Sequence, residues 1–342
     1  MKKLSLKALV LSIAVVPFLF SLSSCSKSDD DDDDSDILGD WSRASDFEGV
    51  ARTEAVTFTI DGNAYVGSGY DGSDRLSDYW SLDPATGTWT QKADIPGDAR
   101  SSAVAFVVNG KGYVGTGYDG LDKLKDFYEY DPVSNSWTRK ADLPGSARYE
   151  AAGFSVADKG YITCGFDGNY LKDLWEYDPL TDIWIQKASL GGTKRSAPQV
   201  FVINGFAYVA GGINNAEYPT DFWKYDPSVN SWSQLRTIAN VSDDEFDDDY
   251  AGIARSNGSA FVMNDKGYLV CGESSGVLGT VWQYNPLNDT WETKTALEAT
   301  ARSGAVCFTV NGSGYITTGS NSSYRFDDLW KFNPDAEQVD NN

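Results

Sequence analysis

Six arginines, two of them followed closely by a glutamate, are the side chains best suited to chemistry in this sequence. Glu54 lies two residues after Arg52, and Glu150 lies two residues after Arg148, with Tyr149 between the second pair. A guanidinium can bind a carboxylate or a sulfate through two parallel hydrogen bonds, and a nearby glutamate can transfer protons. Arg148, Glu54 and Glu150 are therefore candidates for catalysis, and salt-bridged scaffolding is the alternative.

The arginines recur at equivalent positions of a repeated unit. They are Arg52, Arg100, Arg148, Arg195, Arg255 and Arg302. If the units surround an axis, these side chains form a ring at the mouth of a central channel. Such a ring predicts a binding site for an anionic group. The alternative is structural, with each arginine donating hydrogen bonds to carbonyl groups of the next unit.

Three consecutive units share a loop in which an aromatic residue precedes Asp-Gly. These loops begin at Tyr70, Tyr118 and Phe166. Asp-Gly favours a tight turn, so one interpretation is purely structural. The other is an arc of aromatic side chains that, with Tyr149, contacts a ligand at the channel mouth.

The composition removes several kinds of function. The net charge is −22, which repels nucleic acid, so we expect no nucleic-acid partner. The chain contains no histidine, which removes Ser-His-Asp triads, histidine general bases and most transition-metal sites. We therefore expect no metal and no cofactor, and any chemistry must use carboxylates, Tyr, Lys and Arg.

Regularly spaced tryptophans reveal the elements that must position these residues. Their intervals are 47 or 48 residues, except for a final interval of 59. The tryptophans are Trp41, Trp89, Trp137, Trp184, Trp232 and Trp291. Repetition at this period predicts a ring or array of small, equivalent units.

Each unit can be divided into four strands. In the second unit, the apolar run from Ser101 to Val108 predicts strand a, and Asn109-Gly110 predicts a two-residue hairpin turn. Strands b, c and d are expected at residues 112–117, 127–130 and 136–140. The loops between b and c and those between d and a then share one face of the molecule, called here the channel-mouth face.

The unit resembles the kelch repeat, with a small residue and a glycine after strand b, an aromatic residue in c and a tryptophan opening d. The resemblance covers Trp41 to Pro334, although only Gly211-Gly212 keeps both glycines. It implies an all-β, six-bladed kelch-type β-propeller with four-stranded antiparallel blades. The last unit ends at Asn333-Pro334 without a strand d, so the N-terminal segment at Trp41 is predicted to close the last blade.

The N-terminus predicts export and a lipid anchor. A basic start and an apolar stretch lead to Leu22-Ser23-Ser24-Cys25, which resembles the bacterial lipobox, and this implies a lipidated Cys25. The aspartates at 29–34 are either a solvated spacer or an export tag, since they resemble the acidic stretch of surface lipoproteins in Bacteroides-like bacteria. The expected location is the bacterial outer membrane, exposed at the cell surface. We predict a signal peptide at 1–24, a lipidated and acidic linker at 25–36, the propeller at 37–334 and a disordered tail at 335–342.

Two further features leave alternatives open. The fifth unit has an acidic insertion at 240–250, predicted as a mobile flap that either caps the channel or, less simply, binds calcium. Cys164, Cys271 and Cys307 lie in apolar strands and are expected to be buried free thiols, although a Cys271–Cys307 bridge is an alternative.

These observations favour two functions. The first is a monomeric binding module that holds a glycan or a protein ligand at the channel-mouth face and contacts the membrane through Cys25. The second is an enzyme on anionic sugars, similar to the kelch-type sialic acid mutarotases. A kelch-type copper galactose oxidase is excluded because its copper site needs histidines, which this chain lacks.

Overall fold

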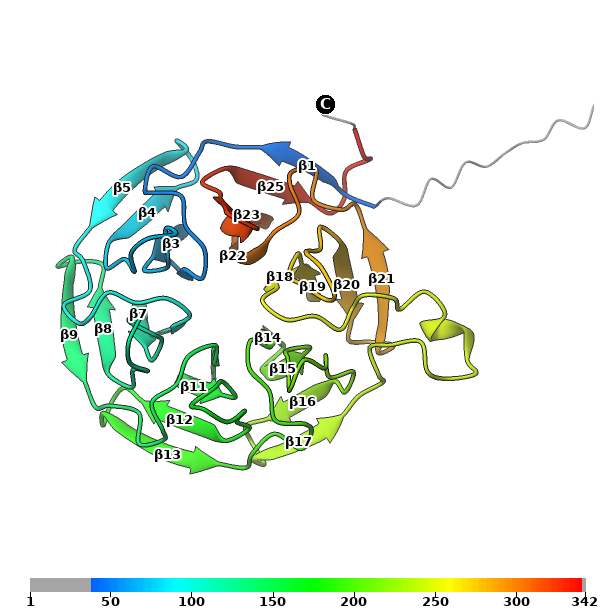
Figure 1. Cartoon of the computed structure of the whole chain (residues 1–342), viewed down its shortest axis with the longest axis horizontal. Helices are drawn as coiled ribbons and strands as arrows, with labels where there is room; N and C mark the ends of the chain where they lie inside the picture. Colours follow the sequence, from blue (N-terminus) through cyan, green and yellow to red (C-terminus); the bar gives the residue numbers. More distant parts are fainter. Residues whose placement is uncertain (1–37, 340–342) are drawn as a thin grey trace, which may run out of the picture. The chain divides into compact units, whose positions relative to one another are not determined.

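The computed structural model describes residues 38–339, which form six small antiparallel sheets arranged around a central axis (Figure 1). Each sheet has four strands in consecutive hydrogen-bonded order, and the last sheet carries one additional short strand. The predicted signal peptide, Cys25, the acidic linker and residues 340–342 lie outside the described residues. Within residues 38–339, no helix is long and apolar enough to span a bilayer.

Strands follow one another from the inside of each blade to its outside. Blades 1 and 2 contain β2 (Val56–Ile60), β3 (Asn63–Gly67), β4 (Tyr79–Asp83), β5 (Thr88–Lys92), β6 (Val104–Val108), β7 (Lys111–Gly115), β8 (Phe127–Asp131) and β9 (Ser136–Lys140). Blades 3 and 4 contain β10 (Ala152–Val156), β11 (Lys159–Thr163), β12 (Leu174–Asp178), β13 (Ile183–Lys187), β14 (Gln199–Ile203), β15 (Phe206–Ala210), β16 (Trp223–Asp226) and β17 (Ser231–Gln234). Blades 5 and 6 contain β18 (Ser259–Met263), β19 (Lys266–Val270), β20 (Val281–Asn285), β21 (Thr290–Lys294), β22 (Ser303–Val310), β23 (Ser313–Asn321), β24 (Tyr324–Arg325), β25 (Leu329–Asn333) and β1 (Asp40–Arg43).

The predicted strands of the second blade are confirmed, with differences at the start of strand a and at the end of strand b. Strand d has the predicted bounds, but strand a begins at Val104 instead of Ser101. Ser102 has a φ of 52°, in the left-handed region, and this backbone turn delays the start of the strand. Strand b ends at Gly115 because Thr116 and Gly117 also have positive φ, at 59° and 105°.

The N-terminal strand closes the ring, as predicted from Trp41. Strand β1 pairs antiparallel with β25, and Trp41 lies opposite Phe332. The Trp41 ring is fully buried, and its centroid lies 4.8 Å from that of Phe332. Its indole nitrogen donates a hydrogen bond to the Thr295 carbonyl of the neighbouring blade. Both ends of the domain thus belong to one sheet, which leaves no open edge between the first and last units.

Aromatic side chains pack between neighbouring blades. In blade 1, Phe58 stacks on Tyr65 with ring centroids 5.1 Å apart, and Tyr130 of blade 2 lies 5.6 Å from Tyr65. A Cβ atom at Gly112 would lie 2.5 Å from the Phe58 ring, so only glycine permits this close approach of the two sheets. Such contacts repeat around the ring and account for most of the buried aromatic core.

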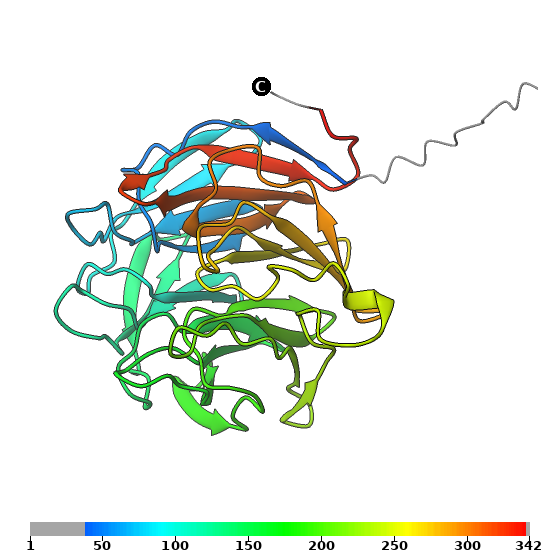
Figure 2. The same ribbon diagram turned by 45° about the vertical axis from the view of Figure 1, so that its right-hand side comes forward.

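The acidic insertion lies at the outer rim instead of over the channel, which corrects the prediction of a channel cap. Figures 1 and 2 show the segment with η1 (Glu245–Asp247) projecting away from the ring centre. The Tyr250 hydroxyl accepts a hydrogen bond from the backbone nitrogen of Trp291, on an outermost strand. Asp247 is buried and accepts hydrogen bonds from the Ser242 backbone and hydroxyl. The Tyr250 contact ties the insertion to the side of blade 5, and the Asp247 contacts close the insertion on itself.

The predicted tail begins within the described region. The backbone nitrogen of Val339 donates a 2.9 Å hydrogen bond to the Asp40 side chain at the start of β1. Residues 335–339 otherwise contain only a turn and irregular backbone.

Candidate functional site

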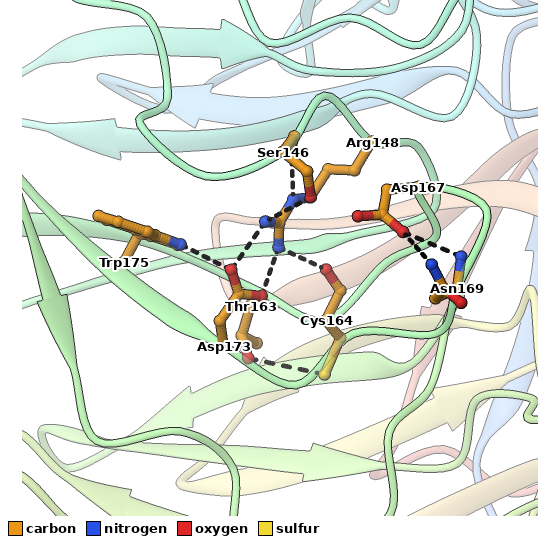
Figure 3. Close-up of polar contacts among 8 residues, drawn as sticks. All are labelled: Ser146, Arg148, Thr163, Cys164, Asp167, Asn169, Asp173 and Trp175. Atoms are coloured by element: carbon orange, nitrogen blue, oxygen red, sulfur yellow. Dashed lines mark hydrogen bonds and ion pairs between the residues drawn. The ribbon is translucent and has the colours of Figure 1, made fainter.

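The repeated arginines are buried in polar clusters at the junction of the d–a and b–c loops. Figure 3 shows the cluster in blade 3, where the Arg148 guanidinium faces Asp173 and the Cys164 carbonyl. Its two terminal nitrogens donate to the two Asp173 oxygens at 2.6 and 2.7 Å. The Trp175 indole nitrogen donates to the same carboxylate at 2.7 Å. The arginine thereby satisfies the carbonyl that ends strand b and clamps the start of strand c.

The same pairing occurs in five blades. The pairs are Arg52–Asp78, Arg100–Asp126, Arg148–Asp173, Arg195–Asp221 and Arg302–Asp328. Every arginine of the ring is fully buried, whereas the paired aspartates are 14–21% exposed. Burial alone would raise the pKa of Asp78, but the hydrogen bond and charge of Arg52 outweigh it and lower the pKa.

This burial corrects the predicted position of Arg52, Arg100, Arg148, Arg195, Arg255 and Arg302 at an open channel mouth. A fully buried guanidinium cannot contact a dissolved ligand without rearrangement, so the geometry supports the structural alternative. The structural alternative is wrong in one detail, because it placed the accepting carbonyl groups in the next unit. Arg148 bonds to a carbonyl of its own blade, Cys164, whereas its own carbonyl accepts from Gly117 of the preceding blade.

Blade 5 departs from this pattern because Thr280 stands where the other blades have aspartate. All five N–H groups of Arg255 donate to neutral acceptors, which are oxygens of Gly252, Ile253, Cys271 and Thr280. Burial lowers the pKa of Arg255 to about 10. The indole nitrogen of Trp282, whose counterparts in four blades donate to aspartate, is buried without a hydrogen-bond partner among the described residues.

The channel is lined by the residues two positions after each arginine, called here the axial ring. They are Glu54, Ser102, Glu150, Ala197, Asn257 and Gly304. All six have φ between 50° and 64°. Each backbone N–H donates to the carbonyl of the preceding member, at 2.7–3.3 Å, so the hydrogen bonds form a closed circle around the axis. The cavity at this circle has a volume of about 140 Å3, which is enough for water or a small polar group.

The two predicted acidic candidates, Glu54 and Glu150, both belong to the axial ring. Glu54 accepts a 2.6 Å hydrogen bond from Ser102, and Glu150 accepts one of 2.8 Å from Ser196. Burial raises the pKa of Glu150, and the charges of Glu54 and Glu273 raise it further. A carboxyl group that is protonated more readily than usual can exchange a proton with a bound ligand. Arg148 does not join this group, because its guanidinium is held by Asp173.

The predicted aromatic residues do lie together on the channel-mouth face. Tyr118 and Tyr149 have ring centroids 5.4 Å apart, and Phe166 lies 5.7 Å from Tyr149. Tyr170, which the sequence analysis did not single out, lies 5.1 Å from Phe166 and extends the row. Tyr70 joins through Arg75, whose guanidinium carbon lies 4.5 Å from the Tyr70 centroid and 5.0 Å from that of Tyr118. We call Tyr70, Tyr118, Tyr149, Phe166 and Tyr170 the aromatic arc.

The arc leads into a hollow between the b–c loops of blades 3 and 4. Its volume is about 450 Å3, and we call it the blade 3–4 hollow. It is lined by Phe166, Gly168, Asn169, Tyr170, Lys194, Asn214 and Asn215. Two aromatic side chains, three amides and one ammonium thus surround one open space. Aromatic faces and amide groups together suit a ligand with both apolar faces and hydroxyl groups.

Metal and thiol chemistry find no support in this region. Among residues 38–339, no group of three or more acidic or cysteine side chains is arranged to hold a metal ion. Cys164, Cys271 and Cys307 are buried free thiols, without the alternative Cys271–Cys307 bridge. Burial raises the pKa of Cys164 and of Cys271 to about 11, which keeps both thiols protonated and unreactive at neutral pH.

Comparison with known proteins agrees with the repeat and with the blade geometry. The family model described as the Kelch motif matches residues 99–144 and 194–237, which contain strand d of blade 2 and strand d of blade 4. This chain is a kelch-type β-propeller. The solved structure of YjhT is similar to it, with a TM-score of 0.70 and 17% sequence identity. The alignment covers 84% of this chain and 96% of that chain.

The comparisons leave the ligand of this propeller undefined. At 17% identity, the likeness to YjhT establishes the fold alone. A comparison with curated protein sequences finds no match. The ligand must therefore be inferred from the side chains that this propeller places on its channel-mouth face.

Proposed function

We propose that this propeller is a glycan-binding module that holds its ligand at the channel-mouth face. The observation that carries the proposal is the blade 3–4 hollow at the end of the aromatic arc. Phe166 and Tyr170 offer ring faces to the apolar side of a sugar. Asn169, Asn214 and Asn215 offer amide donors and acceptors to its hydroxyl groups.

A glycan fits this surface better than a protein partner does. Protein interfaces place a large, dry apolar patch at their centre, whereas the hollow combines two aromatic rings with amide and ammonium groups around an open space. Of the most exposed apolar residues, Val133 at 94%, Leu287 at 91% and Leu180 at 84% lie in the turns after strand c, whereas Leu121 at 89% is a single residue in the b–c loop of blade 2. The turns after strand c lie at the opposite ends of the strands from the b–c loops, and single exposed residues such as Leu121 do not form the apolar patch that a protein interface needs.

The cellular setting is part of the proposal. The lipobox-like sequence at Cys25 and the aspartates that follow it support a lipoprotein on the outer membrane, exposed at the cell surface. A lipid-anchored propeller would hold a glycan near the cell, as a monomer and without a metal.

A binding screen with paired variants tests the proposal. Calorimetric titration with neutral oligosaccharides should detect binding, and the Tyr170→Ala and Asn214→Ala variants should weaken it by roughly five- to ten-fold, as expected for the loss of a stacking or hydrogen-bonding contact. Tyr324→Ala is the matched control, because Tyr324 is 74% exposed in the b–c loop of blade 6 and does not line the hollow. Equal losses in all three variants, or no binding to any glycan, would contradict the proposal.

Chemistry on an anionic sugar is the second candidate, favoured by Glu150. Its pKa is raised by burial, and its neighbour Tyr149, whose pKa burial and the Glu150 charge also raise, stays protonated at neutral pH. A protonatable carboxyl beside a phenol could open and close a sugar ring by proton transfer. Anomer exchange of sialic acid, followed by NMR, should then be accelerated by the protein and lost in Glu150→Gln. Binding without faster exchange would exclude this candidate.

A further inference from the structure

Two arginines that the repeat does not require lie on the aromatic arc at the junction of blades 6, 1 and 2. The Arg75 guanidinium carbon lies 4.5 Å from the Tyr70 ring centroid and 5.0 Å from that of Tyr118. The Arg325 guanidinium carbon lies 5.4 Å from the Tyr70 centroid. Tyr70 therefore contacts two guanidinium groups, and Arg75 contacts two rings. We call Arg325, Tyr70, Arg75 and Tyr118 the arginine–tyrosine stack.

The same contact occurs twice in this stack, because in each case an arginine of one blade lies over the b–c loop of the next blade. Arg325 of blade 6 lies over the loop of blade 1, where a Cβ atom at Gly72 would be 3.4 Å from the guanidinium. Arg75 of blade 1 lies over the loop of blade 2, where a Cβ atom at Gly120 would be 3.2 Å away. The glycines thus leave room for the arginines. Each tyrosine is fixed as well, because its hydroxyl donates to the carbonyl two residues later, at 2.7 Å for Tyr70 and 2.8 Å for Tyr118.

Neither arginine has the carboxylate partner that the ring arginines have. Among the described residues, every ion pair of an arginine involves a residue other than Arg75 and Arg325. The nearby carboxylates of Asp71 and Asp119 accept hydrogen bonds from backbone N–H groups of their own turns. Both arginines are partly exposed. In a chain with a net charge of −22, two stacked and partly exposed guanidinium groups without an ion pair stand out.

We propose that the arginine–tyrosine stack is a subsite for an oxyanion group, a carboxylate or a sulfate ester, carried by the bound glycan. Stacking on tyrosine holds each guanidinium in place. The Nε atoms of both arginines are buried, and one Nη of Arg325 donates to the Ser323 carbonyl at 2.8 Å, so the remaining Nη–H groups are the donors for a charge-assisted contact with the oxyanion. This inference rests on the proposed glycan-binding function and adds a charge requirement to it. The buried arginine ring cannot supply that requirement, because aspartates neutralise five of its six members.

The position of the stack explains how one ligand could use both parts of the face. The arc continues from Tyr118 through Tyr149 and Phe166 to Tyr170, in steps of 5.1–5.7 Å between ring centroids. An oligosaccharide that lies along these rings would have a neutral unit in the blade 3–4 hollow and an acidic unit at Arg75 and Arg325. The subsite therefore selects a charged unit at one end of the chain and not throughout.

Matched glycan probes test this subsite. Three oligosaccharides of similar length are titrated at low salt: oligogalacturonate for the carboxylate, sulfated dextran for the sulfate and unmodified dextran as the neutral probe. We expect at least one anionic probe to bind more tightly than dextran. Its affinity should fall about ten-fold or more in the Arg75→Gln/Arg325→Gln double variant, because charge-assisted hydrogen bonds are lost. The affinity for dextran should not change.

Two further variants separate this role from general charge and from stability. Arg139→Gln removes an exposed arginine that pairs with Asp142 outside the stack, so it should leave every affinity unchanged. Arg75→Lys keeps the charge but loses the planar fork, and its affinity should fall between those of the wild type and Arg75→Gln. Thermal unfolding confirms that each variant is folded.

Each remaining outcome of the titrations overturns the inference in a recognisable way. If the double variant binds the anionic probe as tightly as the wild type while Tyr170→Ala still weakens dextran binding, the subsite is wrong and the glycan-binding proposal stands. If Arg139→Gln weakens binding as much as the double variant, only non-specific charge attraction is present. If no probe binds at any salt concentration, the subsite and the proposed function are both wrong.

Discussion

Blade 5 and the other five blades all bury the repeated arginine, but they surround it with different hydrogen-bond partners. In blade 3, the buried Arg148 is neutralised by Asp173, which also accepts a hydrogen bond from Trp175. In blade 5, the equally buried Arg255 has Thr280 and backbone carbonyls as partners, and Trp282 has lost its acceptor. Hydrogen bonding at the end of strand b is thus retained without charge neutralisation. The comparison indicates that every blade needs the hydrogen bonds from its arginine to backbone carbonyls, whereas a blade can form without the ion pair.

The largest expected difference is between two equivalent arginine variants. Arg148→Gln should lower the free energy of unfolding by about 3 kcal/mol, at the lower end for a broken buried pair, because Asp173 loses its partner but is 21% exposed. Arg255→Gln should cost only about 1 kcal/mol, since removing an unpaired buried charge offsets the lost hydrogen bonds to carbonyls. Urea unfolding of both variants measures the difference, and equal costs would show that the ion pair is unimportant.

A smaller gain is expected when blade 5 is given the missing carboxylate. Thr280→Asp places an acceptor next to Arg255 and the unpartnered Trp282 nitrogen, and should stabilise the domain by about 1–2 kcal/mol. Thr280→Asn is the control, because it matches the size without the charge. The gain should vanish in an Arg255→Gln background, as a double-mutant cycle would show. A loss of stability in Thr280→Asp would mean that blade 5 has adapted to a neutral site.

The smallest effect is the pH dependence of that gain. Burial alone would raise the pKa of Asp126 and Asp328, but their arginine partners lower it, and the carboxylate that Thr280→Asp introduces should behave alike. A carboxylate whose folded pKa is lowered stabilises the protein above its unfolded pKa of about 4 and loses this contribution as the pH falls through the folded value. The stability difference between Thr280→Asp and wild type should therefore be full at pH 7 and decrease progressively as the pH falls below about 4. A constant difference across this range would point to packing in place of charge.

Much of the fold could be predicted from the sequence because the same motif occurs in six successive units. The intervals between tryptophans predicted six blades, and Trp41 predicted that the N-terminal strand closes the last one. Asn109-Gly110 correctly marked the hairpin between strands a and b. The strand starts were less accurate, because the left-handed conformation of Ser102 depends on the hydrogen-bonded axial ring, which only forms when all six blades meet.

The site was harder to predict because it depends on which groups meet after folding. In five units an aspartate follows the repeated arginine by 25 or 26 residues, as Asp173 follows Arg148, and this spacing could have revealed that the arginine is paired and buried. The position of the acidic insertion could also have been foreseen, because it follows the outermost strand of a blade and therefore starts at the rim. The contacts of Arg75 and Arg325 with tyrosines of the next blade could not, because the sequence of one loop does not show which side chains of the next blade lie beside it after folding.

The central claim is that the loops of the channel-mouth face bind the ligand, whereas the buried arginines of the repeat hold the blades together. A crystal structure of the protein with the tightest-binding oligosaccharide of the titrations tests it most directly. The account predicts sugar rings over Phe166 and Tyr170, with Arg148 still paired to Asp173. A ligand bound on the opposite face, or one that displaces Asp173 from Arg148, would contradict it.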